Sequence, residues 1–221
     1  AFAATPVLAL SIEPAVALGI MRPLVMLGDA VTLRPYWRRW SFPDARLLIL
    51  GGVPGVALGA WLYQVANADV FRILIGAISI AFVAYQIAGR RGLIRAATLP
   101  LGRGVGLMTG TIAGFTSFVS HAGGPPVAVY LLSRGLDKTP YQAPTVLPIW
   151  AVNILKFVPY AFLGIFTAET LLVNAVLAPA ALLGAWLGVI AHRLVPERVF
   201  FAITNVLLEQ TGGKLIFDAL T

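Results

Sequence analysis

Apolar runs of about 20 residues recur along this chain and restrict its fold more than any other feature. A helix of that length crosses the roughly 30 Å hydrocarbon core of a bilayer. A soluble protein of 221 residues has no interior large enough for so many helices that are apolar on every side. The runs also lack the alternating polarity of membrane β-strands. We therefore predict an all-α polytopic membrane protein.

Composition supports this prediction, since 11% of the residues are charged and soluble domains carry about 25%. Two further apolar stretches, Phe2–Leu10 and Pro125–Leu132, are too short to cross a bilayer at ~1.5 Å per residue. The predicted membrane-spanning segments are Pro14–Leu33, Leu47–Tyr63, Val70–Ala88, Gly102–Val119, Tyr141–Leu163, Leu171–Ala191 and Val199–Phe217.

The chain repeats itself at an offset of 125 residues, at which Leu58-Gly59-Ala60-Trp61-Leu62 recurs as Leu183-Gly184-Ala185-Trp186-Leu187. At the same offset Pro23 meets Pro148 and Pro54 meets Pro179. We interpret the chain as one transmembrane transporter domain, residues 1–221. Repeat one covers about residues 1–90, a basic connector covers 89–102, and repeat two covers about 101–221.

Basic residues collect in short loops, which explains the net charge of +7 without a nucleic-acid partner. If the predicted spans cross in turn, and Gly102–Val119 with Pro125–Leu132 goes out and returns as a pair, 12 of the 16 basic residues share one side. The positive-inside rule assigns that side to the cytoplasm. The connector 89–102 is then cytoplasmic, and we expect a bacterial inner membrane. Equivalent loops of the two repeats fall on opposite sides, so the repeats are predicted to be inverted, a recurrent plan of secondary transporters.

The motif Gly123-Gly124-Pro125-Pro126 cannot continue a helix, because prolines lack the N–H donor and glycines free the backbone. Such a break at membrane depth needs protein or water around it. A helix that starts at Pro125 would present the positive end of its dipole to an anion. The alternative is a plain external hairpin turn.

Ionisable residues inside predicted spans are functional candidates, because each is costly in a bilayer. Lys156 lies centrally in its span with Asn153 on the same face, and we expect Lys156 to face an anion path or to pair with a carboxylate such as Glu209. Arg22 is a second buried cation. His121 is either a proton carrier or a histidine at the outer interface.

Hydroxyl groups complete the candidate site. Ser120 and Thr145 can donate to oxyanions, although a helical serine often bonds its own backbone. The chain has no cysteine and two widely separated histidines, so we expect neither a metal site nor a cofactor. It also lacks a serine–histidine–carboxylate set or paired aspartates, which disfavours an enzyme.

The chain resembles the TauE/SafE sulfite exporter family over nearly its whole length. The resemblance is carried by Gly123-Gly124-Pro125-Pro126 with Tyr130-Leu131-Leu132, by Thr145, Asn153 and Lys156, by Pro179–Gly188, by Gly28-Asp29 and Leu58–Leu62, and by Gly212-Gly213-Lys214-Leu215-Ile216. The resemblance implies a membrane transporter of sulfite, sulfonates and related small anions. The family's glycine-rich block before a proline like Pro6, and the helix before that block, are missing here. We expect that this chain rather than the gene has lost them.

The sequence therefore predicts a secondary permease of small, sulfur-containing anions that works in the lipid bilayer, with a proton or another ion as a conceivable coupling partner. Two alternatives stay open, a passive anion channel of the same fold and a permease of carboxylates or other organic anions. The oligomeric state is not encoded in any pattern of the sequence.

Overall fold

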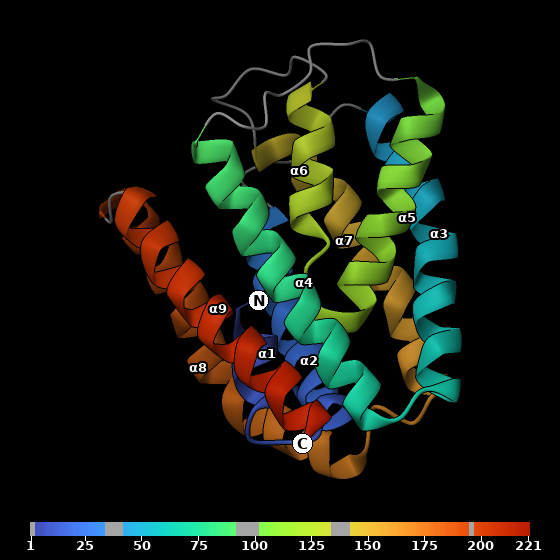
Figure 1. Cartoon of the computed structure of the whole chain (residues 1–221), viewed down its shortest axis with the longest axis vertical. Helices are drawn as coiled ribbons and strands as arrows, with labels where there is room; N and C mark the ends of the chain where they lie inside the picture. Colours follow the sequence, from blue (N-terminus) through green and yellow to red (C-terminus); the bar gives the residue numbers. More distant parts are fainter. Residues whose placement is uncertain (1–2, 34–41, 92–101, 134–141, 195–196) are drawn as a thin grey trace.

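The computed structural model describes residues 3–33, 42–91, 102–133, 142–194 and 197–221, and this part of the chain is built from helices without strands (Figure 1). The helices are α1 (Ala4–Ala9), α2 (Pro14–Leu33), α3 (Phe42–Val65), α4 (Ala68–Arg90), α5 (Arg103–Ser120), α6 (Gly124–Ser133), α7 (Gln142–Phe162), α8 (Ala168–Leu194) and α9 (Glu197–Leu220). Each predicted span is thus a helix whose ends lie within a few residues of the prediction, and the all-helical prediction is confirmed.

Three helices in the described part of the chain are long and apolar enough to cross a membrane, within Phe42–Val65, Ala68–Gly89 and Ala168–Leu187. A shorter apolar helix covers Leu147–Phe162. Two other long helices are more polar: α5 is rich in glycine and hydroxyl side chains, and α9 carries Glu209, Lys214 and Asp218. Several apolar helices of this kind are the architecture of a polytopic membrane protein.

Glycines let α3 and α5 pack with their backbones almost in contact. A Cβ atom on Gly55 would lie 2.1 Å from the Thr111 carbonyl oxygen, and one on Gly51 would lie 2.1 Å from that of Leu107. On the facing helix, a Cβ on Gly110 would meet the Leu48 carbonyl oxygen at 2.4 Å. Both rows of glycine have a four-residue spacing, which lets helices approach closely: Gly51, Gly55 and Gly59 on α3, and Gly106, Gly110 and Gly114 on α5.

The other helices pack around this pair. α4 lies along α9, α2 packs against α8, and α7 packs against α3, α2 and α6. Two apolar clusters meet at the end of α5: Phe118 joins Tyr160 and Leu18, and Val119 joins Phe71 and Leu215. The last turn of α5 is therefore at the centre of the molecule.

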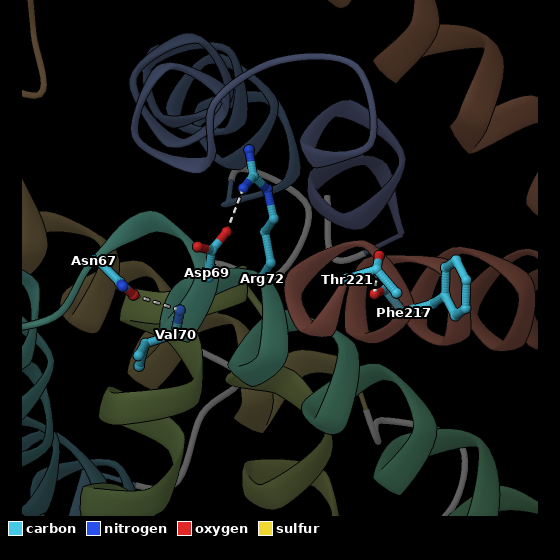
Figure 2. A network of polar contacts seen from close by, with 6 residues as sticks. All are labelled: Asn67, Asp69, Val70, Arg72, Phe217 and Thr221. Carbon is cyan, nitrogen blue, oxygen red and sulfur yellow. Dashed lines mark hydrogen bonds and ion pairs between the residues drawn. The ribbon is translucent and has the colours of Figure 1, made fainter.

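The ends of the bundle carry local polar contacts. The Asn67 side chain accepts a hydrogen bond from the Val70 N–H at the start of α4, and Arg72 pairs with Asp69 at 2.6 Å (Figure 2). On α9, Lys214 pairs with Asp218 at 2.9 Å. These pairs are partly exposed, so each contributes at most about 1 kcal/mol to stability.

Candidate functional site

The link between α5 and α6 is buried in protein. α5 ends at Ser120, and α6 begins at Gly124 rather than at Pro125, one residue earlier than predicted. His121 takes the left-handed conformation, with φ of 57°, and its N–H bonds the Ser117 carbonyl. The side chains of His121 and Ala122 are 8% and 5% exposed. An exposed hairpin turn does not describe this link, which lies partway along the bundle (Figure 1).

Gly123 fits where no larger residue would. A Cβ atom there would lie 2.7 Å from the Ser117 Cβ and 2.8 Å from the Ala113 carbonyl oxygen. At Gly124 a Cβ atom would make an ordinary van der Waals contact, with the nearest side-chain atom 3.7 Å away on Ile149. Gly123 thus lets the chain fold back tightly onto α5, and Gly124 leaves room beside the first turn of α6.

The start of α6 offers fewer backbone donors than most helix starts. The first four N–H groups of a helix have no partner within it. Here two of these four positions are Pro125 and Pro126, which have no N–H. Gly123 and Gly124 supply the N–H groups that stay, so any strong binding of an anion needs side-chain charge as well.

Two side chains of α7 hold the end of α5. Lys156 is fully buried, and its Nζ donates to the Ser117 carbonyl oxygen at 2.7 Å and to the Ser117 Oγ at 2.8 Å. One turn further, the Tyr160 hydroxyl donates to the Phe118 carbonyl at 2.5 Å. A cation at a helix C-terminus is favourable, because the carbonyl ends of the helix carry negative charge. Glu209 is exposed on α9, so the predicted pairing of Lys156 with Glu209 is wrong.

Arg22 joins α2 to the same site. It is fully buried, and its Nη2 donates to the Asn153 carbonyl oxygen at 2.5 Å. Its Nε and Nη1 are buried and have no hydrogen-bond partner among the described residues. The Asn153 side chain donates through Nδ2 to Asp29 at 2.6 Å. Asn153 therefore connects the cation and the carboxylate of α2 to the helix that carries Lys156.

The electrostatics of the site follow from these positions. Arg22 and Lys156 are close enough to repel each other, and Asp29 attracts both. His121 lies within range of both cations. Burying a guanidinium and an ammonium group is costly unless negative charge and hydrogen bonds offset the lost hydration. With Asp29 ionised, the pair of cations leaves one positive charge over, which suits an anionic ligand.

His121 also contacts α1. Its Nδ1 lies 3.4 Å from the Thr5 Oγ1, a buried hydroxyl. Its Nε2 is buried without a partner among the described residues. Ser120, beside it, bonds the carbonyl of Thr116 in its own helix, as serines in helices often do.

The structure thus brings together most of the predicted site residues. Those gathered around the end of α5 are Arg22, Ser120, His121, Gly123, Gly124, Asn153 and Lys156. Pro125 and Pro126 form the first turn of α6. Thr145 belongs to the first turns of α7, and its side chain lies outside the described residues.

Four contacting residues are absent from the predicted set: Thr5, Asp29, Ser117 and Tyr160. Tyr160 had a usable signal, because it lies four residues after Lys156 on the same helix face. Ser117 is a hydroxyl-bearing residue of the same kind as Ser120, but its contact with Lys156 depends on long-range packing. Thr5 had no signal in the sequence. The described residues contain no group of three or more histidine, aspartate or glutamate side chains placed to hold a metal ion.

Comparison with known proteins gives the family of the chain. A family model described as "Sulfite exporter TauE/SafE" matches residues 1–215. The chain belongs to the TauE/SafE sulfite exporter family. This is a family of membrane transporters, so the chain is an integral membrane protein of transport function. No curated protein and no solved structure matched the chain.

Proposed function

We propose that this TauE/SafE protein is a secondary transporter of small sulfur-containing oxyanions such as sulfite and sulfonates, and that the anion binds between α2, α7 and the α5–α6 link. One observation carries the proposal: Arg22 is fully buried, and two of its three guanidinium nitrogens have no hydrogen-bond partner among the described residues. Unsatisfied donors on a buried cation are costly, and an oxyanion would satisfy them.

The neighbouring groups supply the rest of the binding chemistry. Lys156 adds a second positive charge, Asn153 positions Arg22 through its carbonyl, and Gly123 and Gly124 add backbone N–H groups. His121 and Ser120 provide further polar groups beside the break. Thr145 is a further candidate by its sequence position. The sulfur chemistry of the substrate comes from the family, because the geometry by itself favours any compact oxyanion.

We propose that the two repeats are inverted in the membrane. At the offset of 125 residues, α2 corresponds to α7, α3 to α8 and α4 to α9. The contact between α2 and α8 then corresponds to the contact between α7 and α3, and both contacts are present. α3 runs from the upper to the lower end of the molecule in Figure 1, whereas α8 starts at the lower end. Both observations support a two-fold relation in the membrane plane.

We further propose that the α5–α6 link is a helix break at membrane depth, and that the connector 89–102 faces the cytoplasm of a bacterial inner membrane. Burial of His121 and Ala122 supports the first statement. The chain has no cysteine, so a single cysteine at Ala122 is a clean probe. A bulky impermeant thiol reagent should react slowly there, and more slowly still with substrate bound. Fast labelling that substrate does not change contradicts a buried break.

A binding screen tests the function. Purified protein is titrated with sulfite, sulfate, thiosulfate, methanesulfonate and small carboxylates, and binding is read by thermal shift and calorimetry. We expect the sulfur oxyanions to bind, and Arg22→Gln and Lys156→Gln each to weaken binding by about 10- to 100-fold, as the loss of a charge-assisted hydrogen bond predicts.

The matched control is Lys214→Gln, which removes the same charge from an exposed, paired lysine of α9 and should leave affinity unchanged. Full binding by a stable Arg22→Gln protein removes this site from the proposal. Preference for carboxylates indicates an organic-anion permease instead. In proteoliposomes, net anion flux that never runs against the anion's own imposed gradient indicates a passive channel.

A further inference from the structure

His121 is the polar side chain of this region with the most unusual placement. It is buried, with 8% of its surface exposed, and its Nε2 has no hydrogen-bond partner among the described residues. Its backbone is held in the left-handed region, which is uncommon outside glycine and which asparagine, aspartate and histidine adopt more often than other residues. Packing therefore fixes the imidazole beside the break. Its Nε2 faces no acceptor among the described residues and is free to bond an anion in the proposed site.

Charged and polar groups face His121 from each helix around it. Among the described residues, Arg22 of α2 and Lys156 of α7 are the cations within electrostatic range. Thr5 of α1 contacts its Nδ1, and Ser117 of α5 lies between its backbone and the Lys156 ammonium. Asp29 of α2 attracts both cations.

A third positive charge next to Arg22 and Lys156 needs new negative charge. Arg22, Lys156 and Asp29 meet through Asn153 and the end of α5. When all three are ionised and His121 is neutral, one carboxylate against two cations leaves one positive charge. A bound monovalent anion cancels that charge. A proton on His121 then restores the charge that the empty site had, so an anion and a proton together leave the electrostatics of the site unchanged.

We infer that His121 is the proton-coupling residue of this transporter, and that it takes up one proton when an anion binds beside it. This inference rests on the proposed function. The imidazolium has two N–H donors. Nδ1–H can donate to the Thr5 hydroxyl oxygen, and Nε2–H gains an acceptor in the bound oxyanion. The anion and the proton therefore bind and leave as a pair.

Linkage makes the coupling measurable. If anion binding takes up a proton, a lower pH must strengthen anion binding by the same coupling. With about one proton taken up, the apparent Kd falls by up to about tenfold for each pH unit between pH 8 and pH 6. Methanesulfonate is the suitable probe, because it is the anion of a strong acid and cannot itself carry a proton in this range.

Calorimetry of purified protein in buffers of different ionisation heat counts the protons taken up on binding. We expect about one proton per methanesulfonate for the natural protein near pH 7. His121→Asn keeps a residue that tolerates the left-handed backbone. It should lose the proton uptake and the pH dependence, and bind a few-fold more weakly at pH 6. His192→Asn removes the chain's other histidine and should keep both.

Thr5→Val provides a second test if His121→Asn does not fold. Without the acceptor for Nδ1–H, the imidazolium is less stable, so proton uptake should shift to lower pH. Undiminished proton uptake by His121→Asn, or anion binding without proton uptake by the natural protein, overturns the coupling role and leaves the anion site standing. Failure of the natural protein to bind any of the tested anions overturns the proposed function instead, so the two failures are distinguishable.

Discussion

α3 and α8 carry the same Leu-Gly-Ala-Trp-Leu stretch at corresponding places, yet they have different surroundings. In α3 that stretch continues a row of glycines that packs on α5. Of the most apolar 18 residues of α3, 39% are buried. Of the most apolar 18 residues of α8, 11% are buried, and a Cβ atom on Gly184 would meet nothing within 4 Å. α8 has α2 as its main neighbour in the described part of the chain.

The difference teaches that a small residue in a membrane helix matters through the helix opposite it. Gly51 and Gly55 are required because α5 presents backbone at that spot, with its own Gly110 and Gly114. Gly184 meets no such backbone. An apolar face without a protein neighbour suits lipid, which is as apolar as the face itself. Repeated sequence therefore predicts repeated helices, but it does not predict repeated neighbours.

The largest effect expected from this comparison concerns one methyl group in each helix. Gly55→Ala places a Cβ 2.1 Å from a backbone carbonyl that cannot rotate away, so α3 and α5 must separate. We expect a loss of about 2–3 kcal/mol in stability. Gly184→Ala meets open space and should be neutral or stabilising by up to about 1 kcal/mol, since alanine favours helices.

Thermal unfolding of both variants in the same detergent measures this difference. A small and equal effect of the two substitutions would show that α3 and α5 can move apart at little cost. A large loss at Gly184 as well would show that α8 has a close partner in the assembled protein.

Most of the fold could be predicted from sequence, because helix length and all-round apolarity act locally. The seven spans and the two short segments are found where hydropathy, proline and glycine place them. The pairing of α3 with α5 also had a signal, the glycines spaced by four on both helices. The pairing of α4 with α9 runs through one glycine on each helix, Gly76 and Gly212, and two single glycines are too weak a pattern to predict a helix pair.

The candidate site, like the fold, could be predicted from sequence only in part. Arg22, Asn153 and Lys156 stand out in sequence because charge and amide groups are costly in an apolar helix. What Lys156 touches could not be predicted: its partner is Ser117, 39 residues away on another helix, and not Glu209. Asp29 also stands out in sequence as a charged residue inside a predicted span, but its contact with Asn153 depends on how α2 packs against α7.

A smaller effect is expected from a hydrogen bond that crosses the α3–α5 contact. The Thr111 hydroxyl lies 3.0 Å from the Gly51 carbonyl oxygen and 3.1 Å from the Leu107 carbonyl oxygen of its own helix. Thr111→Val removes the bond between helices and should cost about 0.6 kcal/mol, the average for such bonds in membrane proteins.

Thr211→Val is its matched control, because the Thr211 hydroxyl bonds carbonyls of its own helix, those of Leu207 and Leu208. It should change stability less than Thr111→Val does. Equal losses at the two positions, measured by thermal unfolding, would mean that the bond across α3 and α5 adds nothing beyond the local one.

The smallest effect is expected at the two tryptophans of the repeated stretch, Trp61 and Trp186. They are 61% and 60% exposed, so the two helices present this side chain to the surroundings alike, although their other faces differ. Trp61→Leu and Trp186→Leu keep an apolar side chain against lipid, and each should change stability by less than about 0.5 kcal/mol. Unfolding of both variants in lipid bilayers rather than detergent tests this equality. A clear loss at Trp186 alone would place a helix against the exposed face of α8 in the membrane, and the contrast with α3 would then disappear once the protein is fully assembled.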